Sequence, residues 1–117
     1  MYRSIYQRMA EDNGANTRLS ERLALERSIA LLELAKLGSP DSREMIDALY
    51  CVNQLWTAFL EDLAHADNGL PDTLKASLIS IGIWVLRRVE EVRLGKATDL
   101  SALIEVSRSI AGGLTRG

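Results

Sequence analysis

Proline, cysteine and aromatic residues are all scarce in this chain of 117 residues. It has two prolines and only 5% aromatic residues, a composition that favours long helices over short strands. The single cysteine, Cys51, excludes a disulfide within the chain and is typical of a protein from a reducing compartment. The length fits one domain with one modest core.

A long hydrophobic segment is absent as well. The most apolar stretch, residues 78–86, spans nine residues, whereas a membrane-spanning helix needs about twenty. Residues 1–10 contain two arginines but no apolar run of signal-peptide length. We therefore expect a cytoplasmic protein that does not associate with membranes.

The chain also lacks the basic excess that non-specific nucleic-acid binding requires. Its net charge is −2 and its pI is about 5.4. A local basic cluster does occur, although glutamates interrupt it: Arg87, Arg88, Arg93 and Lys96. This cluster is a weak signal for direct contact with RNA.

What is abundant is helical periodicity, which predicts an all-α fold: a small antiparallel bundle of about four helices behind a partly ordered N-terminal arm. We place the arm at residues 1–16 and one bundle domain at residues 17–117. The helices are expected at residues 17–37, 40–66 and 71–94, with a fourth that Thr98 or Asp99 caps and that ends near residue 112. Gly38 and Gly95 are read as helix stops, and Ser39 as the N-cap of the second helix. Short loops make neighbouring helices antiparallel.

The second predicted helix has the most regular apolar pattern. Its large side chains are spaced alternately four and three residues apart, the packing period of antiparallel bundles: Met45, Leu49, Val52, Trp56, Phe59 and Leu63. The fourth helix carries a comparable stripe: Leu100, Leu103, Ile104, Ile110 and Ala111. We expect both sets, including Trp56, to lie in the core.

Residues that could perform catalysis are few. His65 is the only histidine, and it would need Glu61 or Asp62 to build a metal site; a solvated residue at a helix end is the simpler interpretation. Cys51 lies within a helix with no group beside it that would lower its pKa. Adjacent carboxylates such as Glu90-Glu91 point about 100° apart on a helix and do not converge. We predict no enzyme activity, no cofactor and no metal.

The third predicted helix carries more apolar surface than a small bundle needs. One face holds Leu74, Leu78, Ile81, Val85, Val89 and Val92, and a second lies nearly opposite. A helix that is apolar all round is normally surrounded by protein. We predict a partner-binding surface on the second face and its neighbourhood, with residues 34 and 37 as a second wall: Ile79, Ile83, Trp84, Leu86, Leu34 and Leu37. The alternatives are cover by the N-terminal arm, or a homodimer. Gly82, in the same helix, indicates a close helix crossing or a partner that approaches the backbone.

Several short segments stand out along the chain: Met1-Tyr2, Ala48-Leu49, Asn53, Leu55-Trp56, Glu61-Asp62-Leu63, Asn68 with Leu70-Pro71, the run from Leu74 to Gly82, and Gly113-Leu114. Together they resemble the FlaF family of flagellar proteins. The run from Ser77 to Gly82 after Asn68 is the most specific of them.

This resemblance implies a non-enzymatic role in flagellum biogenesis. The expected partner is flagellin, kept soluble by a chaperone-like contact until secretion, and a second expected partner is FlbT, which restrains flagellin translation. The alternative is a post-transcriptional regulator of flagellin mRNA that acts alone or with FlbT.

Overall fold

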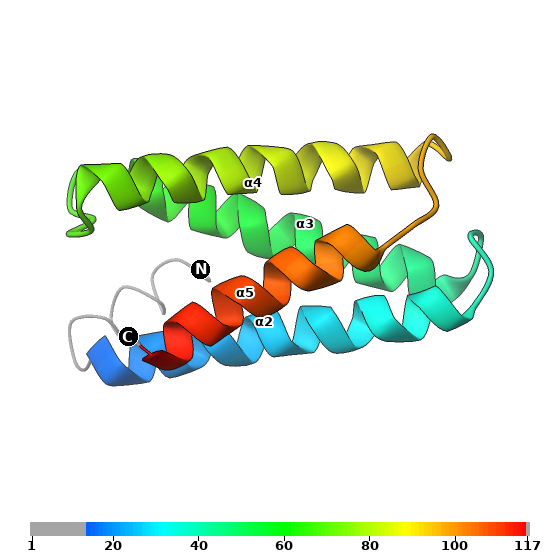
Figure 1. Ribbon diagram of the computed structural model, residues 1–117, viewed down its shortest axis with the longest axis horizontal. Helices are drawn as coiled ribbons and strands as arrows, with labels where there is room; N and C mark the ends of the chain where they lie inside the picture. The colour runs from blue at the N-terminus through cyan, green and yellow to red at the C-terminus, as the bar shows by residue number, and fades with distance from the viewer. Residues whose placement is uncertain (1–13, 117) are drawn as a thin grey trace.

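The computed structural model describes residues 14–116 and shows an all-α chain of four helices (Figure 1). They are α2 (Gly14–Leu37), α3 (Arg43–Ala64), α4 (Asp72–Arg93) and α5 (Ser101–Arg116). Consecutive helices run antiparallel along the long axis (Figure 1), as the short loops predict. Helix α2 begins at Gly14, three residues before its predicted start; residues 1–13 of the predicted arm lie outside the described residues. In the part that is described, no helix is both long and apolar enough to cross a bilayer.

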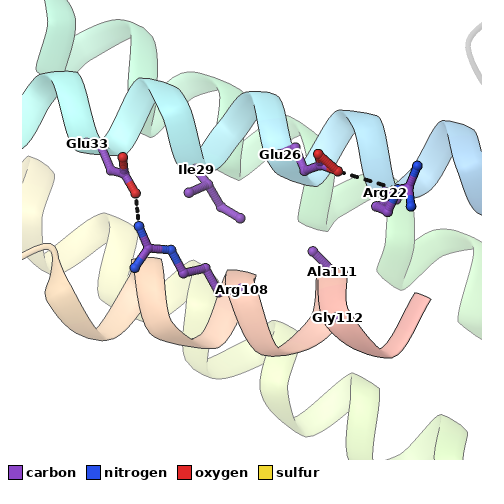
Figure 2. Close-up of a pocket in the computed structure, with 7 residues that line it drawn as sticks. All are labelled: Arg22, Glu26, Ile29, Glu33, Arg108, Ala111 and Gly112. Atoms are coloured by element: carbon purple, nitrogen blue, oxygen red, sulfur yellow. Dashed lines mark hydrogen bonds and ion pairs between the residues drawn. The ribbon is translucent and has the colours of Figure 1, made fainter. Parts of the chain in front are cut away.

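The helices form an open row and not a ring of equal contacts. Helix α2 packs against α5 on one side and against α3 on the other, and α4 packs along α3. Helix α3 therefore lies between α2 and α4 in the order of contacts, and Figure 1 shows α2 and α4 along opposite edges of the view. The α2–α5 contact is bordered by the ion pair between Glu33 and Arg108 (Figure 2). Helix α4 packs along α3, and its valines Val85, Val89 and Val92 belong to the core cluster that also contains residues of α5.

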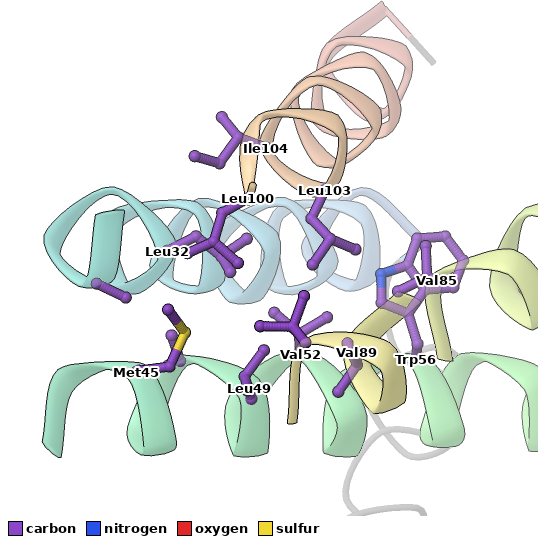
Figure 3. Close-up of a cluster of buried hydrophobic side chains, with 13 residues drawn as sticks. Leu32, Met45, Leu49, Val52, Trp56, Val85, Val89, Leu100, Leu103 and Ile104 are labelled. Carbon is purple, nitrogen blue, oxygen red and sulfur yellow. The ribbon is translucent and has the colours of Figure 1, made fainter. Parts of the chain in front are cut away.

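The core fills the space between the four helices at the level where α5 begins (Figure 3). Its buried side chains are Leu32, Ala35, Met45, Ala48, Leu49, Val52, Trp56, Val85, Val89, Val92, Leu100, Leu103 and Ile104. The predicted seam of α3 is confirmed, with Phe59 partly buried against the same cluster. Trp56 is 1% exposed and meets Phe59 edge to face, with ring centroids 5.4 Å apart. On the predicted core face of α4, Leu74 is an exception because it is 44% exposed.

Local signals at the helix ends explain where each helix starts and stops. Ser42 caps α3: its hydroxyl oxygen accepts a hydrogen bond from Met45 N at 3.2 Å. The predicted N-cap, Ser39, is wrong, because residues 39–42 form a turn in which Ser42 N donates to Ser39 O. Asp99 caps α5 by accepting from Ser101 N at 2.9 Å. That bond, together with the Ser101 side chain, holds the pKa of Asp99 below its usual value.

Gly95 ends α4 in the left-handed conformation expected of a helix stop, with φ of 76°. Its N–H donates to Val92 O, and Lys96 N donates to Glu91 O. These two bonds satisfy the last carbonyls of the helix in a Schellman motif. Gly38 follows the end of α2 without a positive φ, so that helix stops by a different route.

Candidate partner-binding surface

Helix α4 buries one face and leaves apolar side chains on its solvent side. Gly82, Val85, Val89 and Val92 are its buried residues. Ile83 and Trp84 are 43% and 40% exposed. Successive helical residues point about 100° apart, so these two side chains border the solvent side of α4 on opposite flanks.

Gly82 sets the position of this helix on α3. A Cβ at residue 82 would lie 2.7 Å from Leu60 Cδ2 and 3.2 Å from Trp56 Cε3. Real side chains do not approach this closely, so the two helices cross at a distance that the missing side chain permits. The predicted close crossing is confirmed, and the neighbour is α3.

The three residues of the predicted second face differ in burial. Ile83 is exposed, Ile79 is half-buried, and Leu86 is half-buried and packs against the main core cluster. The spacing of i, i+4 and i+7 places all three on one flank of α4. Solvent exposure therefore differs among the three residues, and Ile83 is the most accessible of them.

Further large apolar side chains are exposed on α3 and just past the end of α4, beyond the exposed ion pair of Glu90 with Arg93. Ile46 and Tyr50 are 61% and 62% exposed, and Leu94, just past α4, is 52% exposed. Because α3 and α4 are antiparallel and cross at Gly82, the first half of α3 lies level with the second half of α4. The sequence contains a signal for this surface, because Ile46 and Tyr50 are four residues apart, and therefore on one face of the helix, and neither belongs to the buried seam of α3. We call Ile79, Ile83, Leu86, Ile46, Tyr50 and Leu94 the α3–α4 outer face.

Leu34 and Leu37 lie elsewhere. They are 55% and 87% exposed on α2, which packs with α5 and α3 and not along α4. Figure 1 shows the two helices at opposite edges. The structure therefore does not bring these leucines beside Ile83, and they belong to a separate surface.

A shallow groove of about 300 Å³ lies between α2 and α5 (Figure 2). Ile29 lies at its centre, and ion pairs border it: Arg22 with Glu26 at 3.4 Å, and Arg108 with Glu33. Ala111 and Gly112 form its α5 wall. Each arginine beside the groove pairs with a glutamate of the same chain. The groove therefore has no excess of positive or negative charge that would attract a charged small molecule.

The residues with reactive side chains are dispersed. Cys51 and His65 are fourteen residues apart on α3, which separates them by about 20 Å along the helix. Burial raises the pKa of the Cys51 thiol, with a smaller opposing effect from Arg27, and a raised pKa disfavours the nucleophilic thiolate. His65 Nδ1 accepts a hydrogen bond from Asp67 N near the end of α3. Among residues 14–116 there is no cluster of three potential metal-binding side chains.

The basic cluster at the end of α4 is partly neutralised. Arg93 pairs with Glu90, and Arg88 lies 3.8 Å from Glu91. The hydrogen bond to Arg93 lowers the pKa of Glu90. The positive charge available to a nucleic acid is therefore smaller than the sequence suggests.

Glu21 is the one carboxyl in the described chain whose pKa is moved close to neutrality, to about 7. Burial in the α2–α3 seam is the main cause, and the charge of Asp62 adds to it. Asp62 itself accepts a hydrogen bond from Asn68 Nδ2 at 3.1 Å. The pair lies at the end of the bundle remote from the α3–α4 outer face residues Ile46 and Leu94.

Comparison with known proteins gives one result. The family model described as flagellar protein FlaF matches residues 2–114. The search of curated proteins and the search of solved structures returned no match.

Proposed function

This chain belongs to the FlaF family of flagellar proteins, and from that premise we propose that it is a non-enzymatic flagellum biogenesis factor that binds flagellin. In this role it acts in the cytoplasm as a chaperone-like protein, holding flagellin soluble and so promoting its synthesis and secretion. The family resemblance supplies flagellin as the partner. A contact with FlbT stays a prediction.

The observation that carries the proposal is the α3–α4 outer face. Three large apolar side chains there, Ile46, Tyr50 and Leu94, are each more than half exposed, and Ile83 is nearly so. Several large apolar side chains exposed on one side of a small protein commonly mark a protein–protein interface. A protein whose task is to shield an aggregation-prone chain requires such a surface in its free state.

The spacing of the apolar side chains favours a helical ligand. Ile79, Ile83 and Leu86 recur on α4 at i, i+4 and i+7. This spacing matches the anchor positions by which one amphipathic helix packs its apolar stripe against another. Full burial of one such aliphatic side chain contributes about 1.5–3 kcal/mol.

A non-enzymatic role is supported by the separation of the reactive groups. Cys51 and His65 are too far apart to form a nucleophile–base pair, and the thiol has a raised pKa. The carboxylates Glu26, Glu33 and Glu90 each bind an arginine. Of these ion pairs, the one between Glu33 and Arg108 joins two helices, α2 and α5.

Calorimetric titration with full-length flagellin tests the proposal. We expect the wild type to bind and Ile83→Asp to lose at least about tenfold in affinity, because a buried charge replaces an apolar anchor. The matched control is Leu34→Asp, the same change at a similarly exposed position on α2, which should bind normally. A folded wild type that does not bind flagellin would overturn the function. Equal affinities for both variants would exclude the α3–α4 outer face as the site.

A further inference from the structure

The apolar stripe on the core side of α4 is fully buried over only the second half of the helix. Its three valines between residues 85 and 92 are at most 8% exposed. Toward the start of α4 the same stripe continues through Leu74, Leu78 and Ile81. Leu74 is 44% exposed, and the other two are half-buried. We call these three residues the α4 N-terminal stripe.

The path of α5 explains this difference between the two halves of α4. In Figure 1 the separation between α4 and α5 widens toward the C-terminus of α5. Near that end a second buried cluster, made of Leu25, Leu55 and Ala111, joins α2, α3 and α5. Among the described residues, none of α4 belongs to this cluster. The α4 N-terminal stripe is therefore not covered by α5 as the valines of the second half are.

The segment that precedes α2 enters the bundle at this same end. Helix α2 begins at Gly14, and its first residues lie at the end of the row where α3 ends and α4 begins (Figure 1). A further helix packed between α4 and α2 would lie about 8–10 Å from each of them. Residues 10–13 span up to about 13 Å when extended, so they are long enough to connect such a helix to Gly14.

The sequence of residues 1–13 has the pattern of a short amphipathic helix. Its large apolar residues recur at i, i+3, i+4 and i+7: Tyr2, Ile5, Tyr6 and Met9. Ser4 and Gln7 lie on the opposite side of such a helix, and both are polar. A helix this short is not stable alone in water and forms when its apolar side packs against another surface. The segment therefore supplies the kind of apolar face that the α4 N-terminal stripe can bury.

Charge also favours this segment at this end of the bundle. Residues 1–10 contain two arginines and no acid. Asp62, Asp67 and Asp72 lie where α3 ends and α4 begins, with Lys75 following them, and the side chain of Asp67 is 91% exposed. Opposite charges attract over several ångströms at physiological salt, so the basic segment is drawn toward the acids beside the α4 N-terminal stripe.

We propose that residues 2–9 of this chain fold back as an amphipathic helix onto the α4 N-terminal stripe, with Trp84 at the edge of the contact. Trp84 is 40% exposed and lies one turn beyond Ile81. The contact completes the core where α5 diverges from α4. Ile83 lies on nearly the opposite side of α4 from this stripe, so the proposal does not depend on flagellin binding.

A matched pair of variants in the full chain tests whether the apolar side of the segment is buried. Ile5→Asp should lower the Tm by about 4 °C or more, and it should increase the quenching of tryptophan fluorescence by acrylamide. Trp56 is 1% exposed, so this quenching reports on Trp84. Gln7→Asp introduces the same charge on the polar side and should change neither quantity. If Ile5→Asp has no effect, or the same effect as Gln7→Asp, the proposal is overturned.

Disulfide formation tests where the segment packs. In a Cys51→Ala background, Leu78→Cys is combined with a cysteine at residue 2, 5, 6 or 9, one at a time. At least one pair should form a disulfide within one chain under mild oxidation, because the Cβ atoms of a disulfide lie about 3.5–4.5 Å apart. The control replaces Leu78→Cys with Leu23→Cys, which is 54% exposed on the side of α2 opposite its buried residues, and should form none.

Mass spectrometry separates disulfides within one chain from those between two chains. A disulfide at Leu78→Cys that joins two chains would show that a second copy supplies the segment and would overturn the assignment to the same chain. Absence of any disulfide at Leu78→Cys, or equal yields with Leu23→Cys, would overturn the packing of residues 2–9 on α4.

Discussion

Leu60 occupies the space that a side chain on residue 82 would need. The Cβ of an alanine there would lie 2.7 Å from Leu60 Cδ2, and Trp56 Cε3 is only 3.2 Å away. Leu60 is partly exposed and can move, whereas Trp56 is 1% exposed and held in the core. The contact between Gly82 and α3 therefore fixes how α4 crosses the bundle and which of its flanks face solvent.

Gly82→Ala is expected to destabilise the fold by about 1 kcal/mol. Alanine is the better helix former by roughly 1 kcal/mol, but overpacking a close contact costs about 1–3 kcal/mol, and the second effect is the larger against the rigid indole. Urea unfolding followed by circular dichroism measures the difference.

Leu60→Ala provides the matched test of this contact. If Leu60 opposes the new methyl group, Gly82→Ala should cost less in the Leu60→Ala background than in the wild type, by about 0.5–1 kcal/mol of coupling. Additive effects, or a more stable Gly82→Ala, would show that the crossing tolerates a side chain.

Ser39 and Ser42 both precede α3, and the sequence alone does not show which of them is its N-cap. Ser42→Ala should lower stability by about 1 kcal/mol, because it removes the side-chain acceptor for Met45 N. Ser39→Ala should change stability by less than about 0.5 kcal/mol, since it is the Ser39 backbone oxygen that accepts from Ser42 N. Thermal unfolding of both variants measures the two losses of stability. A larger loss of stability for Ser39→Ala than for Ser42→Ala would contradict the observed cap.

The parts of the fold that could be predicted are those that a regular spacing of apolar residues along one helix determines. The seam of α3 could be predicted because its positions carry large side chains at the bundle period, from Met45 to Leu63. Gly95 could be predicted as a stop because a glycine after an apolar stripe commonly takes the left-handed conformation. Gly82 indicated a close helix crossing because glycine inside a helix is less stable than alanine by about 1 kcal/mol, and a close contact that excludes a side chain accounts for its presence.

Periodicity shows which residues share a face, but it does not show which helices are neighbours. The expectation that Leu34 and Ile83 form two walls of one site is therefore wrong, because α3 lies between α2 and α4 in the order of helix contacts. Ile46 and Tyr50 were missed for the converse reason: their surface forms only when α4 lies beside α3. Two serines three residues apart could each cap α3, and the turn between them decides the choice.

Glu21 gives the fold a dependence on pH. Its pKa in the folded chain is about 7, against an ordinary value of 4.5, so the folded state binds this proton more tightly than the unfolded state. The stability that this adds is complete below about pH 4.5 and is lost as the pH rises through about 7.

Glu21→Gln should therefore raise the free energy of unfolding at pH 8 by about 1–2 kcal/mol, allowing for partial solvation of the group. Near pH 4 the difference should largely disappear. Denaturant titrations of the variant at both pH values measure it, with Glu105→Gln on the exposed side of α5 as the control. Equal stabilisation at both pH values would show that the effect does not arise from this proton.

The extent of the flagellin site can be tested on α3. Ile46→Asp should weaken flagellin binding by about tenfold if the α3–α4 outer face acts as one surface, because Ile46 is 61% exposed and lies level with the end of α4 that Leu94 follows. The change should cost the free protein less than about 0.5 kcal/mol, since exposed positions tolerate substitution.

The control for Ile46→Asp is Asp47→Asn, at the next position on α3, which leaves the apolar face unchanged and removes only the exposed ion pair with Arg43. Its flagellin affinity should equal that of the wild type. If Ile83→Asp abolishes binding while Ile46→Asp does not, the ligand contacts α4 alone and approaches from its solvent side. If both variants lose affinity and the double variant loses less than the sum, one helix of flagellin lies across both positions, because residues that contact the same bound element do not act independently.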